Sequence, residues 1–462
     1  MKPPAGRLDE FLARPRRAVW TVSAPMMAGM MLQVAFLVVE TAFIGRLGET
    51  ALAAMTLLFP LIFTIIAIIN GVGTGITALI AQAIGRRDLV AAERIGGTAI
   101  AFGVILGLGF TAIGLGVGPR LVTHLGGTPT AAALAWSYFA VIALSAPLLF
   151  VGAFLRFLLF GEGDSRTPTV VMIAATLAQV GLDWLFIFRL GLGLRGAALA
   201  GAVAQSGMTA VMLYLLLVRR RNLVKLHWRA LVPAWSTVRA VLAVGVPNSI
   251  TQLLIAFGAL LLNLAVASFG DAALAAFGVG TRVDQVAMMP VVGLASGSVS
   301  VIGMFAGAGR ADLVRATSSY AIRWAVLIAG GIGVCAFAAS VPFMRIFTAN
   351  ATTITVGRHY LMFMVFVYPL MAVVMMVARI LLGLNYPNLS LLIVAVRHLA
   401  LALPIAYVSV YVFHAPIDGV WWGLLIGTAG AMVVAVALLR RIVWRQDPTL
   451  RAVRKDDVVE AA

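Results

Sequence analysis

Two similar stretches lie in different halves of the chain: residues 46–55 read RLGETALAAM and residues 268–277 read SFGDAALAAF. The offset of 222 residues also pairs Pro25 with Pro247, Gly71 with Gly293, Gly75 with Gly297 and Gly85 with Gly307. A lone match would be chance among so many alanines and glycines, but several matches at one offset indicate an internal repeat. The sequence therefore predicts two structurally related halves.

Composition shows in which solvent these halves fold. The 462 residues are 62% hydrophobic and only 11% charged. A soluble domain has about 25% charged residues, so this chain lacks the polar side chains to cover a water-facing surface. Lipid must be the solvent for much of the chain.

Apolar runs recur along the whole sequence, and a membrane-spanning helix needs about 20 such residues. The runs lie at roughly 18–47, 51–85, 95–117, 131–160, 168–190, 196–218, 237–269, 272–306, 312–341, 353–383, 388–413 and 417–443. We predict an all-α integral membrane protein with twelve transmembrane helices in two six-helix bundles. Because six is even, both bundles point the same way and are related by an axis along the membrane normal.

The net charge of +17 comes from bases in short loops between apolar runs. This placement indicates loops that face anionic lipid, so no nucleic-acid partner is expected. The bases concentrate in alternate loops and in both tails, which predicts cytoplasmic termini, as an even number of spans also does. The longest polar stretch, residues 219–235, predicts a linker between domains at 1–228 and 229–462.

Three of the seventeen acidic residues lie inside apolar runs: Glu40, Asp183 and Asp284. A charge at bilayer depth costs about 2.5–3.5 kcal/mol on insertion scales, so such acids are candidate functional groups. Glu40 lies six residues before Arg46 and Asp183 six before Arg189. Each is thus about 9 Å inside the outer end of its helix. If both face one cavity, they can take up and release protons for coupled transport; otherwise each is an inert, paired carboxyl.

Other intramembrane candidates are weaker. Asp284 is two residues from Arg282, a spacing that does not place two side chains together on a helix. Two interpretations of Asp284 and Arg282 remain open: they form a structural ion pair through the bundle, or they have a functional role. His398 could titrate. Pro25 and Pro247 can kink the first and seventh spans and are candidate hinges.

No soluble catalytic motif occurs: the sequence has no P-loop, no dinucleotide fingerprint and no HExxH zinc motif. We therefore expect no enzyme activity, no metal site and no cofactor, with an ion gradient as the energy source. Cys335, the only cysteine, cannot form an intrachain disulfide, and its apolar surroundings predict a buried thiol.

Four motifs resemble the multidrug and toxic compound extrusion (MATE) family: VVETAFIGRLGETALAA, GVGTGITALIAQAIGRRD, GEGDSRTP and LDWLFIFRLGLGLRGAALA. The resemblance covers nearly the whole chain. It implies a V-shaped pair of bundles and alternating access. It also implies export of cationic or amphipathic small molecules against inward H⁺ or Na⁺, across the bacterial inner membrane. We expect a monomer.

The chain is most similar to the DinF-like branch, which carries an acid in the first span and often one in the fifth. This resemblance assigns ion coupling to Glu40 and Asp183, with Gln179 beside them. Three positions depart from the branch: Glu40 replaces Asp, Gln179 replaces Asn, and Gly201 replaces a Thr of the sixth span. These changes remove or displace oxygen ligands, which weakens a Na⁺ site and favours H⁺.

Three alternatives remain open. A lipid-linked precursor flippase of the same superfamily would be favoured if Arg282 and Arg397 faced the cavity together. An integral-membrane enzyme would need polar catalytic groups clustered at one membrane face, which the sequence does not show. A channel is disfavoured by the repeat together with the intramembrane acids.

Overall fold

The computed structural model describes residues 6–124, 128–218, 223–224 and 234–445, and its regular structure there is entirely helical. The first half contains α1 (Gly6–Ala13), α2 (Pro15–Gly45), α3 (Glu49–Gly85), α4 (Leu89–His124), α5 (Pro129–Gly161), α6 (Arg166–Trp184), the π-helical segment η1 (Leu185–Arg189) and α7 (Gly193–Leu217). The second half contains α8 (Trp235–Ala267), α9 (Asp271–Gly307), α10 (Ala311–Ala338), α11 (Ser340–Phe347), α12 (Ala351–Gly383), α13 (Pro387–Ala395), η3 (Val396–Ala402), α14 (Leu403–Tyr407), η4 (Val408–Val412), α15 (Asp418–Leu439) and η5 (Arg440–Arg445).

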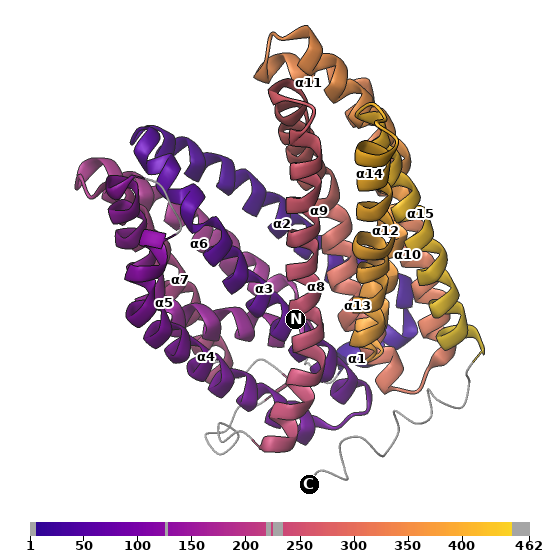
Figure 1. Ribbon diagram of the computed structural model, residues 1–462. Helices are drawn as coiled ribbons and strands as arrows, with labels where there is room; N and C mark the ends of the chain where they lie inside the picture. Colours follow the sequence, from indigo (N-terminus) through magenta and orange to yellow (C-terminus); the bar gives the residue numbers. More distant parts are fainter. Residues whose placement is uncertain (1–5, 125–127, 219–222, 225–233, 446–462) are drawn as a thin grey trace.

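Twelve helices in the described residues are long and apolar enough to cross a membrane, which confirms the predicted number of spans. Figure 1 shows them in two bundles, α2–α7 and α8–η5, which meet at the lower end of the view and diverge at the upper end. The protein is therefore a two-bundle, all-α membrane protein, as predicted. The predicted boundary between residues 228 and 229 lies outside the described residues.

The bundles contact each other through their first two helices, with α2 packed on α9 and α8 packed on α3. Glycines make this approach possible. A Cβ added at Gly71 would lie 2.8 Å from Cα of Ser249, and one added at Gly293 would lie 2.7 Å from Cα of Met27. Ser249 and Met27 are themselves 222 residues apart, so the two contacts are repeat-equivalent.

The same symmetry continues along the helices to their ends. A Cβ on Gly75 would lie 3.3 Å from the Gly245 nitrogen, and one on Gly297 would lie 2.8 Å from Cα of Ser23. At the ends of α3 and α9, a Cβ on Gly85 would lie 2.9 Å from Cα of Gly307. The glycines found in the sequence repeat are thus the residues that let the two bundles pack backbone against backbone.

Polar contacts close the same end of the interface. The Gln82 side-chain amide donates to the carbonyl of Gly383 at 2.9 Å, and the Arg379 guanidinium donates to the Thr74 hydroxyl at 3.3 Å. The short helix α1 lies across this end, where its Asp9 pairs with Arg87 at 2.6 Å.

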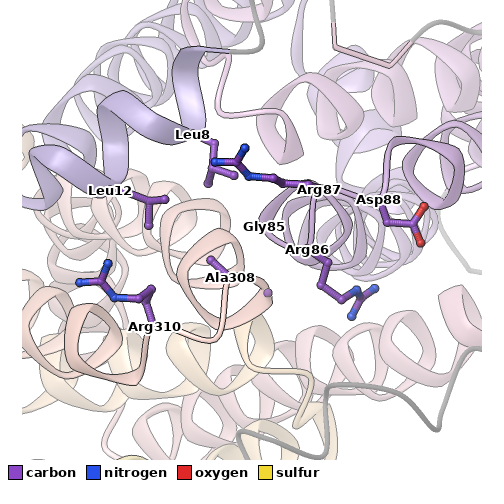
Figure 2. A pocket seen from close by; sticks show the side chains of 9 residues that line it. Leu8, Leu12, Gly85, Arg86, Arg87, Asp88, Ala308 and Arg310 are labelled. Atoms are coloured by element: carbon purple, nitrogen blue, oxygen red, sulfur yellow. The ribbon is translucent and has the colours of Figure 1, made fainter.

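A pocket of about 640 Å³ lies between α1 and the turns that follow α3 and α9. Figure 2 shows the pocket, which is lined by Arg86, Arg87 and Arg310 as well as by Leu8 and Leu12 of α1. Arg310 is paired with Asp312 at 2.7 Å. Asp88 also lines the pocket, and Arg87 is paired with Asp9, so this end of the molecule carries arginines together with acids.

Glu162, just after α5, is buried and accepts a hydrogen bond from the backbone N–H of Val224 at 3.1 Å. Burial raises the pKa of this carboxyl to about 8 from its ordinary 4.5. Burial therefore keeps a proton on Glu162 that an unfolded, solvent-exposed carboxyl would lose between these two pH values.

We expect Gly85→Ala to lower the melting temperature of the detergent-purified protein, because the added methyl would press on the backbone of α9. Gly109→Ala in α4 is the matched control, since a Cβ there has no neighbour within 4 Å. Alanine gains up to about 1 kcal/mol of helix propensity over glycine, so the control should melt at or slightly above the wild type. Equal melting of the two variants would contradict the packing described here.

We also expect the stability of the wild type to fall as pH rises from about 5 to about 8. In the folded protein the buried Glu162 carboxyl is favoured in its protonated form. Its contribution to the free energy of unfolding is therefore full below the unfolded pKa of 4.5 and is lost as pH rises through the folded pKa of about 8. Glu162→Gln should flatten this pH dependence in thermal melts. Glu49→Gln, at the exposed start of α3, should leave the slope as in the wild type.

Candidate functional site in the amino-terminal bundle

Glu40 is placed by α2, whose Met27 contacts α9 of the other bundle. Glu40 follows Met27 by thirteen residues, which turns its side chain about 220° around the helix. It therefore points away from α9 and into its own bundle, where it is half-buried.

Asp183 lies in the last turn of α6, directly before η1. Single turns of π-helix are frequent at functional sites. Its side chain is 0% exposed, and neither carboxyl oxygen has a hydrogen-bond partner among the described residues. A buried carboxylate without a partner is costly, so the position favours a bound proton or cation.

The structure brings the two predicted acids together. Glu40 and Asp183 lie close enough for their charges to interact, and Tyr138 of α5 interacts with both. The sequence analysis missed Tyr138, although a signal was available: it is the repeat equivalent of Tyr360 at the offset of 222. Two carboxyls and a phenol thus form one polar cluster inside the amino-terminal bundle.

Gln179 lies one turn before Asp183 and is half-buried. Its side-chain nitrogen lies over Gly201 of α7, where an added Cβ would be 3.3 Å away. The long amide therefore fills space that a larger residue at position 201 would occupy. In the described part of the chain, no group of three or more His, Cys, Asp or Glu side chains could hold a metal ion.

Asp284 belongs to a different cluster, inside the carboxy-terminal bundle. Its two carboxylate oxygens accept hydrogen bonds from the hydroxyls of Tyr360 and Tyr368, both on α12. Its charge also interacts with that of Arg397. Asp284 is therefore partnered across its bundle by these groups and not by Arg282.

Arg397 and His398 lie in the π-helical segment η3. Arg397 donates to the Thr428 hydroxyl at 3.2 Å, so it is held within the carboxy-terminal bundle. His398 is 5% exposed and packs against Gly258 of α8. Neither of its ring nitrogens has a partner in the described residues. The structure does not bring His398 to the Glu40–Asp183 pair.

The two candidate hinge prolines lie within the interface between the bundles. Pro25 lies between Ser23 and Met27, which both contact α9. Pro247 occupies the equivalent place in α8, between Gly245 and Ser249. A bend at either proline would act directly on the contact that closes the interface, and the hinge role stays a prediction.

The repeat, the twelve spans and the buried carboxylates define a membrane transporter built from two equivalent bundles. The family model MatE matches residues 25–185 and 247–408, so each matched segment begins at one of the two prolines. The chain belongs to this family. Its members are transporters and not enzymes, so the protein is a multi-pass membrane transporter of small molecules.

Individual relatives agree with this assignment. The chain is 26% identical to a FAD transporter of Shewanella oneidensis, over 87% of this chain and 89% of that protein. It is 23% identical to a probable multidrug resistance protein NorM of Thermotoga maritima, over 89% of both chains. An outward-facing MATE transporter of the MOP superfamily superposes with a TM-score of 0.89 at 26% identity, over 95% of this chain and 97% of the other.

We expect the Asp284 cluster to be structural. Asp284→Asn leaves the buried Arg397 without its opposite charge, which should cost of the order of 3 kcal/mol and lower the melting temperature. Arg397→Gln alone should also destabilise. Because the two charges interact, the double variant should lose clearly less than the sum of the single losses. Additive losses would show that the two groups do not form a unit.

Proposed function

We propose that the protein is a proton-coupled antiporter that exports amphipathic small molecules by alternating access. The observation that carries this proposal is the Glu40–Asp183 pair, in which Asp183 is buried and Glu40 half-buried, and which has no basic partner among the described residues. We place the transporter in the bacterial inner membrane as a monomer of the DinF-like branch, with both termini in the cytoplasm. The arginines in the turns at the closed end, Arg86, Arg87 and Arg310, support that orientation.

The geometry suggests how proton binding affects the bundles. Helix α2 carries Glu40 on the face that points into its own bundle and Met27 on the face that contacts α9. A proton that loads Glu40 changes the packing of α2 against its own bundle, and the same helix carries Pro25 within the interface. A proton with different affinity for two arrangements of α2 shifts the balance between them.

Protons suit this site better than Na⁺. Sodium needs several oxygen ligands, and Gly201 offers none from a side chain. The amide nitrogen of Gln179, which donates and does not accept, is placed nearest that glycine. Sodium coupling is the alternative, and a Na⁺ gradient belongs in the test.

The substrate class is amphipathic, with cationic compounds included by the family resemblance. The relatives differ in what they carry, since one is described as a FAD transporter and another as a probable multidrug resistance protein. Export of a nucleotide-like aromatic anion is therefore a second candidate function. A lipid-linked precursor flippase loses support, because Arg397 lies within its bundle and does not share a cavity with Arg282.

The test is dye transport in proteoliposomes under an imposed pH gradient or an imposed Na⁺ gradient. We expect the pH gradient to drive transport by the wild type, and Glu40→Gln and Asp183→Asn to abolish it while the proteins remain inserted. Glu49→Gln is the matched control, because this acid lies exposed at the outer end of α3 and should not affect transport.

Three results would change the proposal. Normal pH-driven transport by Glu40→Gln would remove Glu40 from the coupling site. Transport driven by Na⁺ alone would replace proton coupling by sodium coupling. No transport of cationic or anionic dye under either gradient, in a well-inserted wild type, would favour the flippase.

A further inference from the structure

Arg282 lies on the face of α9 that points toward the other bundle. On that face, Gly293 and Gly297 contact α2. Arg282 precedes Gly293 by eleven residues, which returns its side chain to within about 20° of the same direction. The Arg282 side chain is exposed, so α2 does not cover this face of α9 at Arg282 as it does at Gly293 and Gly297. Figure 1 shows that α2 and α9 diverge toward the upper end of the view.

No acid in the described parts of the chain forms an ion pair with Arg282. The side chain is exposed and makes no hydrogen bond or ion pair within the described parts of the chain. Its neighbour Asp284 lies nine residues before Gly293, half a revolution away from the Gly293 face. Asp284 is instead bonded to Tyr360 and Tyr368 inside its own bundle.

The depth of Arg282 decides what it faces. It follows Asp271, the first residue of α9, by eleven residues, or about 16 Å of helix. Arg282 therefore lies within the outer third of the 37-residue apolar span. An unpaired guanidinium at that depth is stable only where water reaches it, so Arg282 faces the water-filled space between the bundles and not lipid.

The surrounding wall is apolar. Four helices, α2, α3, α8 and α9, contact the opposite bundle at the closed end and continue outward from there. Between their outer ends and the glycine contacts, their described residues include only three ionisable ones: Glu40 and Asp284, which turn into their own bundles, and Arg282. The repeat equivalent of Arg282 on α3 is the uncharged Pro60. Exposed apolar side chains, such as Val38 of α2 and Leu260 of α8, are typical of the other residues of these helices.

We propose that Arg282 is a substrate-recognition residue that selects amphipathic molecules carrying an anionic group, such as a carboxylate, sulfonate or phosphate. The apolar wall takes the hydrophobic part of the molecule, and the guanidinium binds the anion with two parallel hydrogen bonds. The inference rests on the proposed export function and names its substrate class. A free anionic compound and an anionic phospholipid share this chemistry.

The experiment compares two fluorescent dyes with a related aromatic body, anionic carboxyfluorescein and cationic rhodamine 6G. Binding to the detergent-purified full-length protein is measured by fluorescence polarisation. We expect the wild type to prefer carboxyfluorescein and Arg282→Gln to weaken its binding about tenfold or more, as expected for losing a charge-assisted hydrogen bond. Arg282→Lys should retain part of the affinity.

Arg345→Gln is the matched control, because this exposed arginine lies on α11, outside the twelve spans. It should bind both dyes as the wild type does. Arg282→Glu should reverse the preference toward rhodamine 6G. Short-chain phosphatidylglycerol is added as a competitor: displacement of the dye in the wild type assigns the anion site to a phospholipid, and no displacement assigns it to free compounds.

Tighter wild-type binding of rhodamine 6G, or unchanged carboxyfluorescein binding by Arg282→Gln in a folded protein, would overturn the inference. Transport in proteoliposomes separates this failure from that of the export function. Arg282-dependent binding without pH-driven transport would leave the anion site standing and remove the coupled-export proposal. A pH gradient that moves rhodamine 6G but not carboxyfluorescein would support coupled export and contradict the anion site at Arg282.

Discussion

The close approach of helix backbones at the repeat glycines is the constraint on which the rest of the structure depends. At Gly85 and Gly307 the ends of α3 and α9 touch with no room for a side chain. The same condition holds at Gly71 and Gly293. Since lipid provides no hydrophobic force between helices, such close packing is what holds two bundles together in a membrane. Both halves therefore need glycine at these positions, because only glycine lets the helices pack this closely.

The two halves share this packing but differ in their charges. Tyr138 and Tyr360 are repeat equivalents, and each lies beside acidic residues within the membrane: Tyr138 beside Glu40 and Asp183, and Tyr360 beside Asp284. In the carboxy-terminal bundle a second tyrosine and Arg397 balance Asp284. In the amino-terminal bundle the two acids lie together, and none of the described residues places a base beside them. We therefore assign proton coupling, as proposed above, to the amino-terminal pair of acids, and we expect the paired Asp284 cluster to contribute to stability.

Much of the fold followed from the sequence, because hydropathy reports which residues meet lipid and the glycine offset reports a packing symmetry. The matched depth of Glu40 and Asp183 followed from the sequence, whereas their proximity was only one of two alternatives. The direction of each side chain around its helix did not follow, because neighbouring helices set it. Hydropathy could therefore not indicate that Asp284 bonds to Tyr360 and Tyr368 on α12. The expectation for Cys335 was wrong: it is exposed, because apolar residues of a membrane helix face lipid as readily as core.

Helix α2 connects the chemistry of the site to the movement of the bundles. One of its faces carries Glu40 into the amino-terminal cluster, and another contacts α9, the helix that carries Arg282. The proposed proton site at Glu40 and the proposed anion site at Arg282 thus belong to two helices that pack directly on each other. A ligand shifts a conformational equilibrium only by its difference in affinity for the two states. If both ligands bind differently when the α2–α9 contact changes, each alters the affinity for the other by the same factor, which is the condition for coupling.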